Sequence, residues 1–308
     1  MIIRSKQPIR KMTMTDEVEK SPVVEEPVAP VAEPVAEAGT AAPLSSAPEY
    51  IAPAVSTDAA IAEVVAKTDK TKGVCDIVFL IDATGSMQPA IDDIKRNISK
   101  FFNELSAVGP NGDTIVKDWR ARVIAYRDVK EDGIANWYVD NPFVRDPKEI
   151  ENQLNTFKAD GGGDEPESLL DALYKVAKFG NTPKCTQKED PTMWRYRSEA
   201  ARVVIVFTDA SFHATTALPE APNLDWQEIA NLIMQEKIRL SIYAPQMRCY
   251  DDLSQIDKCE FMPIEFDPEV PNDAVYKLRD FTADTANFQR TLQQLAKTVS
   301  ASAVAETL

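Results

Sequence analysis

The segment at residues 74–87 constrains the fold more than any other part of the chain. It begins with an unbroken run of strand-forming residues, VCDIVFLI, and ends in Asp82-Ala-Thr84-Gly-Ser86. A carboxylate and two hydroxyls at alternate positions of a strand end give an incomplete shell of oxygen ligands for a divalent cation. The alternative interpretation is a buried strand followed by a polar turn, because Asp, Thr, Gly and Ser are common turn residues.

Two later segments favour the metal-binding interpretation. Residues 201–209 are a second β-branched run that closes in a carboxylate, Asp209, and residues 161–167 (GGGDEPE) are a Gly-rich acidic loop. Such apolar runs are typical of buried parallel strands, and ligands in open α/β sheets gather outside the carboxyl ends of the strands. Clustered carboxylates repel one another unless a cation lies among them. We therefore expect the three loops to meet around one divalent ion.

These three segments resemble the von Willebrand factor type A (vWA) domain and its metal-ion-dependent adhesion site (MIDAS). The resemblance covers about residues 73–300. It implies an α/β fold with a Rossmann-like, doubly wound and mostly parallel sheet, helices on both faces, and one Mg²⁺ at the top of the sheet, with Mn²⁺ or Ca²⁺ as alternatives. It also implies that Thr84 and Ser86 bind the metal directly, whereas Asp82 and Asp209 act directly or through water.

The middle loop departs from the usual vWA pattern, in which a Thr is often the ligand. No Thr lies between residues 159 and 168, and the order Asp164-x-Pro166-Glu167 is similar to the I-like domain of integrin β subunits. That similarity implies Glu167 as the ligand from this loop. It also implies a neighbouring second-ion site that includes Asp164, although Gly162 stands where a side-chain ligand is expected. Whether Asp164 binds a second ion stays open.

Two acidic residues and the only histidine lie near these loops, and we interpret them structurally. Asp92 and Asp93 come too late in the chain to match the accessory ion site of the I-like family. We expect them in a solvated first turn of a helix that starts near Gln88, where negative charge suits the helix dipole. His213 follows the third loop, and we expect it to have a loop or supporting role rather than a Ser-His catalytic one.

The insertion at residues 181–198 is rich in aromatic and Arg residues. It contains Trp194, Arg195, Tyr196 and Arg197. Such residues are common anchors at protein interfaces, so the insertion is a candidate recognition surface beside the site. The alternative is that it packs against the domain. The sequence does not choose between the two.

The rest of the domain alternates strand and helix patterns. Strands are expected at residues 74–81, 120–126, 137–139, 201–208, 238–243 and 260–266, and helices near 88–105, 147–157, 166–179, 225–237 and 284–299. Strands separated by helices imply parallel pairing with right-handed crossovers.

Residues 1–70 differ in composition from the remainder. They contain one aromatic residue and one Leu, while Pro, Ala, Val and Glu recur. Such a segment buries too little apolar surface to offset the entropy of ordering. We therefore expect a disordered tail at residues 1–70, a vWA domain at 71–302 and a C-terminal tail at 303–308. No secretory or membrane-spanning run is seen, which predicts a cytoplasmic protein without membrane insertion.

The charge and the cysteines exclude some functions. The formal net charge of −15 argues against nucleic-acid binding, because phosphate recognition needs clustered Lys and Arg. The four cysteines have no metal-binding spacing, and without a signal peptide we expect reduced thiols. Whether Cys249 and Cys259 are bridged stays open.

The resemblance implies a non-enzymatic, metal-dependent protein-binding module with an adhesion or adaptor role. An Asp or Glu carboxylate of a protein ligand would complete the Mg²⁺ coordination. The alternative is a metal-dependent hydrolase or phosphotransferase of haloacid-dehalogenase-like type, since those enzymes also begin with an Asp after a first strand. They carry a second acid two residues later, where this chain has Thr84. The chain has no GxxxxGK[ST] phosphate loop, so an ATPase or kinase partner would be a separate protein.

Overall fold

The computed structural model describes residues 73–107, 116–163 and 165–284, together with the single residues 286, 290, 294 and 299. The expected tails at residues 1–70 and 303–308 lie outside the described residues. So do Asp164 and most of the helix expected at 284–299.

Six strands form one sheet in the order β3-β2-β1-β4-β5-β6. They are β1 (Val74–Asp82), β2 (Asp118–Tyr126), β3 (Tyr138–Asp140), β4 (Ala201–Phe207), β5 (Ile238–Pro245) and β6 (Cys259–Ile264). All neighbours are parallel except the edge pair β2 and β3. The chain continues from β1 to β2 on one side and returns to β4 on the other, so β1 and β4 flank the switch point where ligands bind in such sheets.

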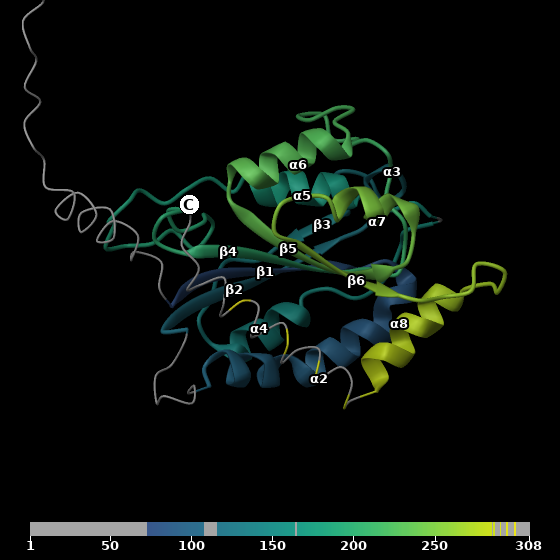
Figure 1. The fold of residues 1–308 in the computed structure, drawn as a ribbon, viewed down its shortest axis with the longest axis horizontal. Helices are drawn as coiled ribbons and strands as arrows, with labels where there is room; N and C mark the ends of the chain where they lie inside the picture. Colours follow the sequence, from purple (N-terminus) through teal and green to yellow (C-terminus); the bar gives the residue numbers. More distant parts are fainter. Residues whose placement is uncertain are drawn as a thin grey trace, which may run out of the picture. The chain divides into compact units, whose positions relative to one another are not determined.

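Helices cover both faces of the sheet (Figure 1). One face carries α2 (Gln88–Leu105), α4 (Pro147–Leu154) and α8 (Asp273–Ala283), and the other carries α3 (Val129–Asp132), α5 (Leu169–Ala177), α6 (Trp226–Gln235) and α7 (Arg248–Leu253). The short 3-10 helix η1 (Gly85–Met87) leads into α2. This arrangement confirms the predicted doubly wound α/β architecture.

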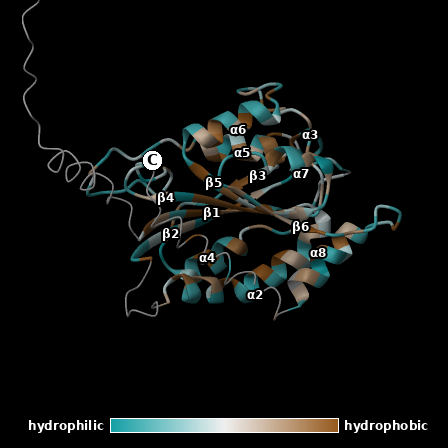
Figure 2. Cartoon of the chain, viewed as in Figure 1, coloured by the Kyte–Doolittle hydropathy of each residue, from teal (hydrophilic) through white to brown (hydrophobic). Residues whose placement is uncertain are grey.

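Two apolar cores lie between the sheet and its helices. Figure 2 shows hydrophobic strands in the middle and hydrophilic outer faces on the helices. On the α2 side the rings of Phe79, Phe101 and Phe102 pack edge to face, with centroids 5.1–6.1 Å apart. The central strand β4 is buried along its whole length, which explains why its sequence is continuously apolar rather than alternating.

The expectation of a solvated first turn is wrong for Asp93. Helix α2 does begin at Gln88, but Asp93 lies in its second turn, is 3% exposed and is paired with Arg96. Residues spaced three and four apart share a helix face, so Asp93 falls on the buried stripe together with Ala90 and Asn97. Asp92 is half-buried and accepts a hydrogen bond from the side chain of Gln88 at 2.8 Å.

The insertion at residues 181–198 packs against the domain through its aromatic and Arg residues. Trp194 is fully buried, and its indole N–H donates to the carbonyl of Val176 at 3.0 Å. Arg195 donates to the buried carboxylate of Asp76 at 2.7 Å, and Arg120 binds the same carboxylate from β2 at 2.8 Å. The packing alternative therefore holds for these two insertion residues, Trp194 and Arg195.

All four cysteines lie within the described residues and are free thiols. Helix α8 begins at Asp273, earlier than the expected terminal helix, after Asn272 in a left-handed conformation. Within the described residues, every helix is too short or too polar to span a bilayer.

Candidate metal centre

The three predicted loops meet at the carboxyl end of the sheet. The register pairs Ile81 of β1 with Phe207 of β4, so the residues that follow them, Asp82 and Thr208, are neighbours. The Thr208 hydroxyl donates to Asp82 Oδ2 at 2.7 Å. Thus the strand pairing itself brings the first and third loops together.

Asp82 lies at the base of the site. It is fully buried, and its Oδ1 accepts hydrogen bonds from the backbone N–H and the hydroxyl of Thr84, at 2.9 and 2.7 Å. Burial raises the pKa of Asp82 above its ordinary value. These bonds fix the loop between β1 and η1, and they leave the lone pairs of the Thr84 hydroxyl free to bind a cation.

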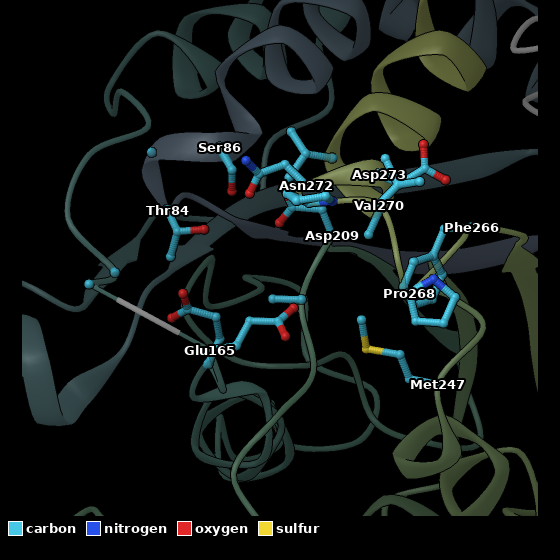
Figure 3. A pocket seen from close by; sticks show the side chains of 18 of the residues that line it. Thr84, Ser86, Glu165, Asp209, Met247, Phe266, Pro268, Val270, Asn272 and Asp273 are labelled. Carbon is cyan, nitrogen blue, oxygen red and sulfur yellow. The ribbon is translucent and has the colours of Figure 1, made fainter.

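Four of the predicted ligands line one cavity of about 590 Å³ (Figure 3). They are Thr84, Ser86, Glu167 and Asp209. Ser86 is exposed, while the other three are almost fully buried. Asp82 lies outside the cavity lining, and Asp164 lies outside the described residues.

Buried carboxylate oxygens in this cavity have no hydrogen-bond partner. They are both oxygens of Asp209 and Oε2 of Glu167. Burial, followed by the charge of Asp82, raises the pKa of Glu167 to about 9 and that of Asp209 to about 7. The hydroxyl of Ser86 offsets part of the rise for Asp209, although it does not form a hydrogen bond of normal geometry. A cation among these oxygens would supply the missing partner.

The Gly-rich loop approaches the site closely because Gly162 has no side chain. Its φ is +87°, and a Cβ there would lie 2.5 Å from Cγ2 of Thr84 and 2.9 Å from Oε1 of Glu167. This is the position where the integrin-like pattern expects a side-chain ligand. The structure leaves no room for one, because the second loop packs directly on the first.

Backbone hydrogen bonds join Glu167 to the loop that follows β4. Its N–H donates to the carbonyl of Ser211 at 2.9 Å, and its carbonyl accepts from the N–H of His213 at 3.0 Å. The second and third loops are therefore joined on both sides of the candidate ligand.

A buried polar network supports this junction, and sequence reasoning missed its centre, Asp128. The Ser168 hydroxyl donates to Asp128 Oδ1 at 2.9 Å, and Asp128 Oδ2 lies 3.0 Å from His213 Nε2. Asp128 follows β2 by two residues, so a carboxylate just beyond a strand was the available signal. Ser168 is bonded to the carboxylate rather than to the imidazole, so these residues do not form a nucleophilic triad, and His213 has a supporting role.

The donor set fits a hard divalent cation. Carboxylate and hydroxyl oxygens are the ligands that Mg²⁺ and Ca²⁺ take in proteins. Among the described residues, no group of three or more Asp, Glu, His or Cys side chains is arranged to hold a metal ion alone. A site here would need the hydroxyls of Thr84 and Ser86 as well, and it would stay open on the cavity side.

A doubly wound sheet with oxygen-lined loops at its switch point defines a Rossmann-like domain with a ligand site at the top. The family profile of the von Willebrand factor type A domain matches residues 76–294, and the chain belongs to this family. Domains of the family commonly mediate metal-dependent protein interactions and are generally not enzymes.

Individual relatives share only part of their length with this chain. The α-protein kinase vwkA of Dictyostelium discoideum is 27% identical over 140 residues, which are 46% of this chain. The match spans 19% of the length of that kinase.

Similar solved structures include a pilus adhesin and a protein of the mussel byssus. The pilus adhesin SpaC of Lactobacillus rhamnosus GG is 11% identical, with a TM-score of 0.41 over 74% of this chain and 31% of the adhesin. Proximal thread matrix protein 1 of the mussel byssus is 14% identical, with a TM-score of 0.36 over 72% of this chain and 46% of the mussel protein.

Proposed function

We propose that this chain is a divalent-metal-dependent protein-binding module with a site of the MIDAS type. A partner's Asp or Glu carboxylate would complete the coordination of Mg²⁺, or of Mn²⁺ or Ca²⁺ in its place. The observation that carries the proposal is the set of buried, unpartnered carboxylate oxygens of Glu167 and Asp209, which face the same cavity as two hydroxyls. Adhesion and adaptor roles both use such a site.

The role of each residue in metal binding would depend on its position in the site. Thr84 and Ser86 would bind the metal through their hydroxyls, since the Thr84 proton is already donated to Asp82. Glu167, the ligand of an integrin-β-like loop, and Asp209 would bind directly or through water. Asp82 would act from beneath by orienting Thr84. Asp164 lies outside the described residues, and its binding of a second ion stays open.

The metal would supply a positive charge with an open coordination position. Without it, the acidic side chains at the cavity would repel a partner carboxylate. Recognition would therefore depend on the metal, and the electrostatic match between site and partner would reverse on chelation.

The burial of Asp82 speaks against the hydrolase alternative. A haloacid-dehalogenase-like enzyme needs this Asp as a nucleophile, but both of its oxygens accept hydrogen bonds and the side chain does not line the cavity. Cytoplasmic location and a separate ATPase or kinase partner stay predictions.

Affinity capture with the full chain would test the proposed function. Proteins would be captured from the native extract in Mg²⁺ and in excess EDTA, with Ser86→Ala and Asp209→Asn as site variants. Ser254→Ala removes another exposed hydroxyl and is the matched control. We expect captured proteins to be lost in EDTA and with both site variants. Equal capture under all of these conditions would overturn the proposal.

A further inference from the structure

The cavity has a second half that the metal centre does not use. Opposite Thr84 and Ser86 its wall is mainly apolar, with Asn272 and Asp273 as polar members (Figure 3). Besides Ala210 and Ala274, the apolar lining consists of Met247, Phe266, Pro268, Val270, Pro271 and Val275. Apart from Ala210 and Met247, these residues belong to the loop after β6 and the first turn of α8. Oxygen ligands and an apolar wall therefore share one space of about 590 Å³, which is typical of a ligand site.

Hydrogen bonds inside the loop hold the apolar wall in place. The N–H of Asp267 donates to Oδ2 of Asp273 at 2.8 Å, and the N–H of Val270 donates to the carbonyl of Asp267 at 3.1 Å. The N–H of Asp273 donates back to the carbonyl of Val270 at 3.1 Å. The loop is thus pre-organised, which lowers the entropy lost when a ligand binds.

Val270 presents its side chain to solvent from this loop. It is 46% exposed, and only three other large hydrophobic residues in the described part of the chain are comparably exposed. Those three are Ile134, Met234 and Tyr276, and none of them lines the cavity. An exposed apolar residue at the mouth of a ligand cavity favours contact with an apolar group of the ligand.

The charges of the cavity divide its two halves. Its charged lining residues, within the part of the chain that the structure describes, are all acidic: Glu165, Glu167, Asp209 and Asp273. Three of them lie at the oxygen-rich end, and Asp273 is already bonded to the Asp267 N–H. A second carboxylate of the ligand would be repelled, while an uncharged apolar side chain would fit the remaining wall.

We propose that the partner presents its metal-binding Asp or Glu next to a large apolar residue, and that the loop at residues 266–271 holds this residue. The inference rests on the proposed function and adds the chemistry of the partner. The occupant is a protein segment with an acid and a Leu-, Ile-, Met- or Phe-sized side chain one or two positions apart. Burying such a side chain would raise the affinity roughly 10- to 100-fold over an Ala at that position.

A positional-scanning peptide library tests the proposal. The full chain would be immobilised and exposed to hexapeptides with one fixed Asp and each flanking position varied, in Mg²⁺ and in EDTA, with Asn replacing Asp in a parallel set. We expect Mg²⁺-dependent, Asp-dependent retention with large apolar residues enriched at one flanking position.

Substitutions in the wall would locate the apolar contact. Val270→Ser and Met247→Gln should reduce the apolar enrichment at least tenfold while Asp-dependent retention persists. Met234→Gln changes an equally exposed residue on α6, outside the cavity, and should leave the enrichment unchanged. Circular dichroism would confirm that each variant is folded.

The outcomes separate this inference from the proposed function. Asp-dependent retention without an apolar preference, or with a preference for Lys or Arg, overturns the inference alone. An apolar preference that persists in both wall variants also overturns it. Retention that ignores EDTA, equal retention of Asn peptides, or no retention of any peptide in Mg²⁺ overturns the proposed function and the inference together.

Discussion

Strand β1 carries a fully buried aspartate near each end, and their surroundings are opposite. Asp76, near its start, lies between the guanidinium groups of Arg120 and Arg195. Asp82, at its end about 20 Å away, has hydroxyl partners and acidic neighbours. In the described part of the chain, no Lys or Arg forms an ion pair with Asp82, Glu167 or Asp209.

The two aspartates illustrate two kinds of buried charge. One kind is paired within the chain and stabilises the fold, and the other is left without an ion pair and can serve a ligand site. Burying a carboxylate costs several kcal/mol unless a partner compensates it. At the Asp76 end the chain supplies its own cations, which join β1, β2 and the insertion. At the Asp82 end the described residues supply none, so the carboxylates are left with raised pKa values and oxygens without partners. We infer that the missing cation comes from solution.

The largest effect should come from breaking the ion pairs of Asp76. Asp76→Asn leaves Arg120 and Arg195 buried without their shared counter-charge, so we expect a loss of about 3–5 kcal/mol in the free energy of unfolding. Asp209→Asn removes an unpaired carboxylate and should be neutral or stabilising in EDTA. Urea denaturation measures both. A loss below about 1 kcal/mol for Asp76→Asn would show that the ion pairs of Asp76 do not stabilise the fold, and the proposed difference between the two ends of β1 would not hold.

Mg²⁺ should stabilise the protein only through the Asp82 end of β1, where the carboxylates have no ion pair within the described residues. A ligand at about 100 times its dissociation constant adds about 2.7 kcal/mol to the free energy of unfolding. Thermal unfolding in Mg²⁺ and in EDTA should differ for the wild type and for Asp76→Asn, if the latter is folded, but not for Asp209→Asn. An equal Mg²⁺ effect in Asp209→Asn would place the metal elsewhere.

Replacing Glu167 by Gln should stabilise the metal-free protein at high pH. The folded-state pKa of Glu167 is about 9, above the ordinary value of 4.5, so the folded state binds more protons between these values. Its contribution to stability is therefore present at low pH and lost as the pH rises from about 4.5 to about 9. At pH 8 in EDTA we expect the free energy of unfolding of Glu167→Gln to exceed that of the wild type by on the order of 1–3 kcal/mol.

Urea denaturation at pH 5.5 and at pH 8 would check this dependence. The gain from Glu167→Gln should be small at the lower pH and larger at the higher one. A gain that is the same at both values would show that the pKa of Glu167 is not raised in the folded protein.

The smallest effect should come from the supporting network. His213→Ala removes the side-chain contact with Asp128 and should lower the free energy of unfolding by about 1 kcal/mol. Since this contact braces the loop that carries Glu167, Mg²⁺ affinity should fall as well. Calorimetric titration would measure the affinity. An unchanged affinity would limit His213 to a role in folding.

Much of the site was predictable because it is local to strand ends. Apolar runs that close in a carboxylate fixed the positions of Asp82 and Asp209, and parallel pairing then required the two ends to be adjacent. The centre of the supporting network, Asp128, carries the same signal, but an Asp in the turn after a strand is also an ordinary turn residue.

The ion pairs of Asp76 were not predictable from local patterns in the sequence. Asp76 and Arg195 are 119 residues apart in sequence, and an Asp within a strand run gives no indication of its partner. The burial of Asp93 depends on the packing of α2 rather than on its charge. The apolar wall of the cavity arises from a loop whose shape is set by hydrogen bonds among its own residues.

A crystal structure of the full chain grown in Mn²⁺ would show whether a divalent cation binds among these carboxylates and hydroxyls. We expect an anomalous difference peak among the oxygens of Thr84, Ser86 and Asp209, with Glu167 bound directly or through water. A peak at some other place, or none in the cavity while Glu167 and Asp209 keep oxygens without partners, would contradict it.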